Sequence, residues 1–247
     1  MATSMPENGK LARVRAILAK AEDPAASPEE AQAYFAKAAE LMAKYGIERA
    51  MLAETRPESD ALTSRTVDVK GSYILDNANL LMAIVEAIGG QSVRWRLYDR
   101  TAGRYYQHVK IYGHESTLDR AEMLYTSLLL QAHNGMKHGR PEWGESTTAY
   151  RKSWLSGFRS VVVKRLEMAE GQAAAETASL PSGRSAELVL VDRAEAVLAL
   201  FKREHPKIRT APARRLTGSG WHEGAEAGKR ADLGQTRIAP RRAALSA

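Results

Sequence analysis

Cysteine is absent from the 247-residue chain, which excludes a disulfide framework, a thiolate metal site and a cysteine nucleophile. Long hydrophobic runs are also missing, and no stretch approaches the roughly 20 apolar residues that cross a bilayer. The first ten residues, MATSMPENGK, lack the apolar core that a signal peptide requires. These absences predict a cytoplasmic protein with no membrane partner.

The composition is that of an ordinary globular chain, with 44% hydrophobic and 26% charged residues. A chain of this length buries roughly 70–75% of the surface that its unfolded form exposes. We therefore expect one or two domains that fold without a disulfide, a metal or another cofactor.

Positive charge is concentrated at one end of the sequence. Residues 1–201 contain 25 Lys and Arg against 25 Asp and Glu, whereas residues 202–247 contain 11 against four. The last segment thus carries the whole formal net charge of +7. Clustered positive charge attracts polyanions through the release of counterions, which favours a nucleic-acid partner. The alternative is a solvated tail that serves solubility.

The N-terminal part predicts a helical hairpin. Apolar residues recur at helical spacing over residues 11–21. A second helix has its start signal at Ser27, which forms a capping box with Glu30. Gly46 is predicted to end this helix, and a short third helix is expected over 48–54.

The middle of the chain predicts a compact α+β module. A short strand is expected over 66–69 and a helix over 79–88. The runs QSVRWRLY and YYQHVKIY alternate with a period of two on either side of DRTAGR, which predicts a β-hairpin. A long helix is expected next, over 115–137.

The C-terminal part is predicted to be mainly helical. A helix is expected from about Tyr150, a buried strand at ELVLVD (187–192), a helix over 193–204, and a last short helix from Trp221. The fold class is therefore α+β, with an N-terminal helical hairpin, a central strand–helix–hairpin–helix module, and a helical C-terminal region with one further strand and a basic tail. The expected units are residues 1–57, 62–140, 148–205 and 206–247.

The N-terminal segment resembles a known family. The motifs are LAKAED at 18–23, the helix start PEEA at 28–31 and the helix end AELM at 39–42 followed by GI at 46–47. These residues are similar to the bacterial and phage family catalogued as domain of unknown function 2786. The runs VKIYGH, LVLVDR and GWHEGAEAGKRADLG resemble the segments C-terminal to this domain in phage and actinobacterial relatives. The resemblance implies a similar arrangement of parts and brings no catalytic residue with it.

The predicted hairpin suggests a nucleic-acid-binding face. If Val93 and Trp95 face the core together with Val109 and Ile111, alternation directs basic and aromatic side chains to the opposite face. That face would consist of Arg94, Arg96, Tyr98, Tyr106, His108, Lys110 and Tyr112. Single-stranded nucleic acid is held by such a mixture of rings for the bases and cations for the phosphates. An ordinary solvated face, or one covered by a helix, is the alternative.

The C-terminal segment adds cations and an unusual glycine pattern. Lys207, Arg209, Arg214 and Arg215 are predicted to contact phosphates. Glycines at 220, 224 and 228 would form a smooth strip on a helix, which favours close packing against another helix. An anion site at residues 217–220 is the weaker alternative, because neither phosphate-binding fingerprint is complete.

No catalytic or metal site is recognisable in the sequence. His222-Glu223 lacks the second histidine of a zincin motif, since Glu226 stands in its place. The sequence therefore predicts a nucleic-acid-associated accessory protein that binds DNA or RNA through the hairpin and the basic C-terminal region. Two other classes stay open: a module that binds a host protein, and an enzyme whose site is assembled from residues far apart.

Overall fold

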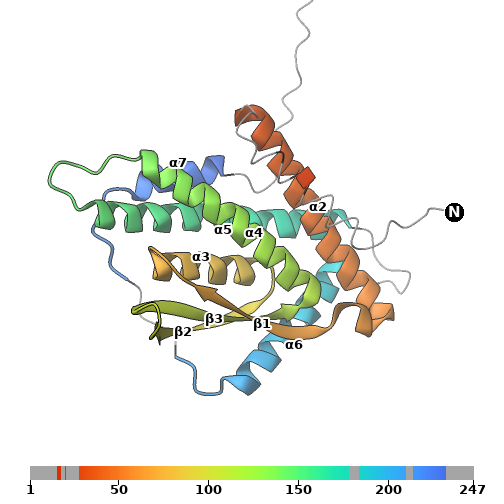
Figure 1. The fold of residues 1–247 in the computed structure, drawn as a ribbon. Coiled ribbons are helices and arrows are strands. Elements are labelled where there is room, and N and C mark those ends of the chain that lie inside the picture. Colours follow the sequence, from red (N-terminus) through yellow and green to blue (C-terminus); the bar gives the residue numbers. More distant parts are fainter. Residues whose placement is uncertain (1–15, 18–19, 21–27, 178–183, 210–213, 232–247) are drawn as a thin grey trace, which may run out of the picture.

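The computed structural model describes residues 16–17, 20, 28–177, 184–209 and 214–231 (Figure 1). The helix predicted over 11–21 lies mostly outside these ranges, and only residues 16, 17 and 20 of it are described, as helical. The predicted tail beyond residue 231 also lies outside the described residues.

The described elements confirm the predicted α+β class. Their order is α2 (Pro28–Thr55), the 3-10 helix η1 (Pro57–Asp60), β1 (Leu62–Val69), α3 (Ile74–Ala87), β2 (Gln91–Asp99), β3 (Arg104–His114), α4 (Glu115–His138), α5 (Thr147–Glu176), α6 (Ala186–Glu204) and α7 (Trp221–Arg230). None of the described helices is both long enough and apolar enough to cross a membrane.

The three strands form one antiparallel sheet in the order β1-β3-β2. Figure 1 shows α3 lying across one face of this sheet, with α4, α5 and α7 stacked behind it, while α6 lies at the opposite face. The hairpin predicted from the two alternating runs is confirmed, with residues 100–103 as its turn. We call the two faces the α3 side and the α6 side.

The main core lies between the α3 side of the sheet and the helices behind it. Leu81, Ile84 and Val85 of α3 are fully buried against Val109 and Ile111 of β3. The helix predicted over 79–88 begins earlier than expected, at Ile74. The residue before it, Tyr73, has a left-handed backbone conformation with φ 54°, and the first turn of α3 starts directly after it. Five residues of α4 also belong to this core: Leu118, Ala121, Leu124, Leu128 and Ala132.

The close packing predicted for the C-terminal glycines is present between α5 and α7. A Cβ atom at Gly224 would overlap the carbonyl oxygen of Trp154, and one at Gly228 would lie 2.8 Å from the carbonyl oxygen of Phe158. The N-terminus of α7 is already complemented by an acid, since the backbone N–H of Ser219 donates to Glu145 Oε1 over 2.7 Å. The glycines therefore allow close contact between the helices. At residues 217–220, where an anion site was the alternative prediction, the carboxylate of Glu145 occupies the position of an anion.

The strand predicted at 187–192 is wrong, because these residues belong to α6. Four apolar residues between charges fit a buried strand or a helix equally well. The wider spacing decides for the helix, since Val189, Val197 and Phe201 fall on one helical face and are buried. Ser185 caps this helix by accepting a hydrogen bond from the backbone N–H of Leu188.

The helix end predicted at Gly46 is also wrong, since α2 continues unbroken to Thr55 and absorbs the predicted helix over 48–54. A Cβ atom at Gly46 would overlap the guanidinium of Arg120, a buried α4 side chain that pairs with Glu170 of α5. The glycine thus provides room for a buried arginine. Sequence alone does not distinguish this role from a helix stop.

Candidate nucleic-acid interface

The strand register divides the predicted binding face between the two sides of the sheet. Arg94 lies opposite Val109 and Arg96 opposite Gln107, whereas Trp95 lies opposite His108. Directly opposed residues of an antiparallel pair point to the same side. The prediction that the hairpin cations share one face is therefore wrong. In this register an odd-numbered residue of β2 is opposite an even-numbered residue of β3, so the two alternations are out of phase.

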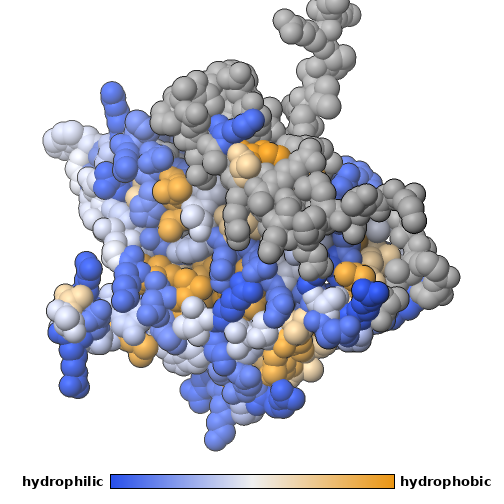
Figure 2. All heavy atoms as spheres, turned by 45° about the vertical axis from the view of Figure 1, so that its right-hand side comes forward, coloured by the Kyte–Doolittle hydropathy of each residue, from blue (hydrophilic) through white to orange (hydrophobic). Residues whose placement is uncertain are grey.

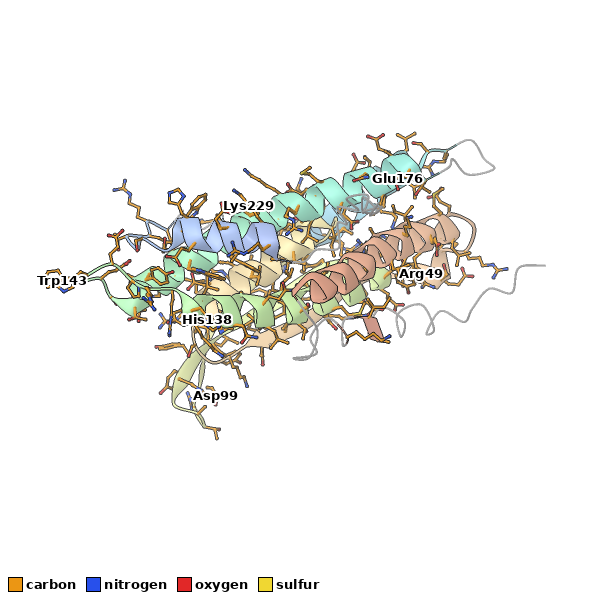
Figure 3. The ribbon with its side chains drawn as sticks, turned by 90° about the horizontal axis from the view of Figure 1, so that it is seen from above. Arg49, Asp99, His138, Trp143, Glu176 and Lys229 are labelled. Atoms are coloured by element: carbon orange, nitrogen blue, oxygen red, sulfur yellow. The ribbon has the colours of Figure 1, made fainter. Side chains whose placement is uncertain are left out.

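On the α3 side, Arg94 and Arg96 differ in their surroundings. Arg94 is half-buried, and its Nη1 donates to Gln107 Oε1 over 3.2 Å. Arg96 is exposed, with its guanidinium carbon 3.7 Å from the ring centre of Tyr105. Arg96 lies nearer the hairpin tip, which projects beyond the helices at Asp99 in Figure 3.

On the α6 side, four rings form a continuous series that we call the aromatic row. The ring of Tyr106 lies 6.5 Å from that of His108, and His108 lies 6.0 Å from Trp95. Trp95 in turn lies 5.7 Å from His205, the residue that caps the C-terminus of α6. The row therefore crosses from β3 through β2 to the end of α6, and Trp95 at its middle is 40% exposed.

Acidic side chains neutralise part of the predicted charge on this side. His108 Nδ1 lies 2.7 Å from Asp68 Oδ1, and Lys110 Nζ donates to Glu204 Oε2 over 2.8 Å. Tyr112, predicted to lie on the open face, is instead fully buried under α6, where its hydroxyl donates to Glu204 Oε2 over 2.7 Å. α6 therefore covers the part of this side around Tyr112 and leaves the part nearer the hairpin tip open.

The predicted C-terminal cations also separate. Lys207 and Arg209 come directly after the aromatic row and are exposed, with no acidic partner among the described residues. Arg214 lies on the other side of the sheet, where its Nη1 is 2.8 Å from Asp76 Oδ1 at the start of α3. Arg215, beside it, is exposed. The nine predicted binding residues thus form two groups, and only one includes the aromatic row.

The sequence interpretation missed Trp95 and His205. It assigned Trp95 to the core, although the turn centred on residues 100–103 already pairs Tyr98 with Tyr105 and hence Trp95 with His108. The contact of His205 with Trp95 joins segments that are distant in sequence, so no local pattern indicates it.

Exposed apolar residues alone do not mark an interface. In Figure 2, hydrophobic side chains form several patches among predominantly hydrophilic ones. Across the described ranges, no three His, Asp or Glu side chains gather where they could hold a metal ion. The combination of rings and cations on the α6 side is therefore what marks a candidate site.

Fold and surface together define an α+β protein with an open aromatic and basic hairpin. Residues 9–49 match the family model described as "Protein of unknown function (DUF2786)", which confirms the resemblance for this segment. No curated protein and no solved structure matches the chain. The matched segment ends before the hairpin, so the aromatic row has to be interpreted from its own chemistry.

Proposed function

We propose that the protein is a nucleic-acid-associated accessory protein that binds single-stranded DNA or RNA along the aromatic row. The observation that carries this proposal is the position of Trp95, partly exposed between the rings of His108 and His205. Bases stack on such side chains irrespective of sequence, and each stacked base contributes about 1–3 kcal/mol.

Cations on the same side can meet the phosphates of a bound strand. Lys70 Nζ lies 5.3 Å from the ring centre of Tyr106 at one end of the row and 3.8 Å from Asp99 Oδ2. Lys207 and Arg209 lie just beyond the other end, after His205. Lys110 is held by Glu204 and Lys70 is partly neutralised by Asp99, and so we assign most of the attraction for phosphate to Lys207 and Arg209. A strand running along the row would meet cations before and after the rings.

The proposal is tested by titrating a labelled 12-nucleotide oligothymidine and measuring fluorescence anisotropy. Trp95→Ala should weaken binding by about 5- to 150-fold, which corresponds to the loss of about 1–3 kcal/mol of stacking. Trp143→Ala is the matched control, because Trp143 lies fully exposed in the loop between α4 and α5, outside the aromatic row. This control should bind like the unmodified protein.

The salt dependence provides an independent measure of phosphate binding. Replacing both Lys207 and Arg209 by Ala should flatten the plot of log affinity against log salt by about 0.7 for each phosphate that the protein no longer neutralises. Thermal melting should confirm that every variant is folded. Failure of the unmodified protein to bind at low salt, or equal binding by the Trp95 and Trp143 variants, would overturn the proposal.

A further inference from the structure

A pocket of about 470 Å³ opens on the α3 side, between the start of α3 and the first turns of α5. Its polar and charged lining comes from three separate segments: Ser72, Asp76, Thr148, Arg151, Lys152 and Arg214. Pockets that bind small molecules commonly measure about 300–1,000 Å³. This pocket is thus large enough for a small ligand, and it lies across the sheet from the aromatic row.

The lining carries an excess of positive charge. Arg214 is paired with Asp76, the acidic residue of the lining, through an Nη1–Oδ1 distance of 2.8 Å. Arg151 and Lys152 are partly exposed and have no acidic partner in the part of the chain that the structure describes. Three cations therefore face one carboxylate, which leaves a formal charge of +2 for an incoming anion.

Two further guanidinium groups strengthen the positive field. Burial, and then the neighbouring charge of Arg214, lower the pKa of Arg94. The pKa of Arg159 is also lowered, mainly by burial; Arg214 adds to this effect and Asp76 opposes it. Burial raises the pKa of Glu86, the other acid beside Arg159. Arg94 and Arg159, which lie outside the lining, are thus each repelled by Arg214, and an anion bound beside Arg214 would relieve this repulsion.

The N-terminus of α3 would not by itself bind an anion at this pocket. Asp76, in its first turn, already complements the helix dipole. The backbone N–H of Asn77 is also engaged, donating to the carbonyl oxygen of Tyr73 over 2.9 Å. The binding groups are therefore the side chains of Arg151, Lys152 and Arg214, which come from α5 and from the segment before α7.

We propose that this pocket binds a phosphoryl group, either as free phosphate or at the end of a nucleotide or strand. A phosphate monoester carries a charge of about −1.5 to −2 near pH 7 and has three strong acceptor oxygens, which suit the net charge of the lining. The planar guanidinium groups can each offer two N–H donors to such oxygens. The hydroxyls of Ser72 and Thr148 lie in the same lining as further donors. This site does not depend on the aromatic row.

Isothermal titration of the full chain with inorganic phosphate, at constant ionic strength in chloride, tests the pocket directly. We expect saturable binding that Lys152→Ala weakens about tenfold and that Arg151→Ala combined with Lys152→Ala abolishes. Lys164→Ala is the matched control, since Lys164 is exposed on the same helix about 18 Å further along. This control should retain full affinity.

The source of the phosphoryl group is distinguished by a second titration. A thymidine dinucleotide with a 5′-phosphate is compared with the same dinucleotide ending in a 5′-hydroxyl. Tighter binding of the phosphorylated form than of both the hydroxyl form and inorganic phosphate assigns the pocket to a strand or nucleotide end. A phosphorylated form that binds no more tightly than inorganic phosphate assigns the pocket to free phosphate.

Two outcomes would overturn the pocket proposal: no saturable phosphate binding by the unmodified protein, or equal losses in the Lys152 and Lys164 variants. Measuring oligothymidine binding by the same variants shows whether the aromatic row still binds nucleic acid when the pocket has been altered. Trp95→Ala should leave phosphate binding intact, so either proposal can fail without the other.

Discussion

The two sides of the sheet hold their helices by different means. On the α3 side, fully buried aliphatic residues such as Ile84 and Ile111 belong to a core that extends through α4 and α5. On the α6 side, the apolar contact is a small cluster of Val93, Tyr112, Val197 and Phe201, with Leu200 at its edge. Ion pairs supplement it in the middle of α6, from Arg193 to Asp60, and at the C-terminal end of α6, from Glu204 to Lys110.

This difference helps to explain why the aromatic row stays open. The broad apolar contact of α3 buries Val109 completely and leaves Arg96 and Tyr105 exposed only nearer the hairpin tip, whereas α6 covers less of its side. Because α6 meets the sheet mainly through this small cluster and the Glu204–Lys110 pair, the outer part of the hairpin stays accessible on this side, and Trp95 and Leu97 are each 40% exposed. We infer that the α3 side mainly provides stability, whereas the α6 side leaves rings available for a ligand.

The largest expected effect tests the polar attachment of α6. Asp60 is fully buried, pairs with Arg193, and accepts hydrogen bonds from the backbone N–H and the hydroxyl of Ser116 over 2.8 and 2.7 Å. Asp60→Asn should lower the free energy of unfolding by about 3–5 kcal/mol, because it leaves the buried guanidinium without its counter-charge. Urea denaturation measures this loss.

Glu204→Gln, at the C-terminal end of α6, is the control for that substitution. The ion pair of Glu204 with Lys110 is partly solvated, with side-chain exposures of 36% and 30%, so its loss should cost much less than the loss of the Asp60–Arg193 pair. Equal losses in the two variants would contradict the view that the Asp60–Arg193 pair anchors the helix.

Local patterns predicted most elements, because their signals lie within the elements themselves. The alternation around DRTAGR defined the hairpin, and helical spacing defined α4 and α5. The strand predicted at 187–192 failed because a short apolar run carries no period of its own, and the burial of Val197 and Phe201 becomes visible only with the whole helix.

The binding surface was less predictable than the elements. Trp95 and His108 could have been paired from the symmetry of the turn, but the contact of Trp95 with His205 depends on where α6 packs. The same holds for Arg214, whose pairing with Asp76 joins the segment before α7 to the start of α3. Tertiary placement decides such contacts, and no sequence spacing encodes them.

A smaller effect is expected from the close packing behind α3. At Gly224 a methyl group would overlap the backbone of Trp154, which cannot move aside as a flexible side chain can. Gly224→Ala should therefore destabilise the protein by about 1–3 kcal/mol in thermal or urea unfolding. Gly171→Ala is the matched control on α5, since nothing lies within 4 Å of its added methyl group, and it should stabilise by up to about 1 kcal/mol. Stabilisation by both substitutions would show that α5 and α7 are not in close backbone contact at Gly224.

The smallest expected effect concerns a polar contact between α3 and α4. His133 of α4 lies with Nε2 3.1 Å from Asn77 Oδ1 of α3. Burial, and then the charge of Lys137, lower the pKa of His133 below its ordinary value of 6.5. Below that value the unfolded chain binds a proton that the folded protein does not, so stability should fall as the pH falls through 6.5 towards the folded-state pKa.

Urea midpoints between pH 7.5 and 5.5, compared with those of His133→Gln, isolate this contribution. His114, whose pKa is also lowered by burial, acts in the same direction, whereas Glu86, whose pKa is raised by burial, acts in the opposite one. Both groups are retained in the variant, so the difference between the two profiles reports His133 alone. The variant should lose less stability than the unmodified protein over this range, and parallel profiles would mean that folding does not lower the pKa of His133.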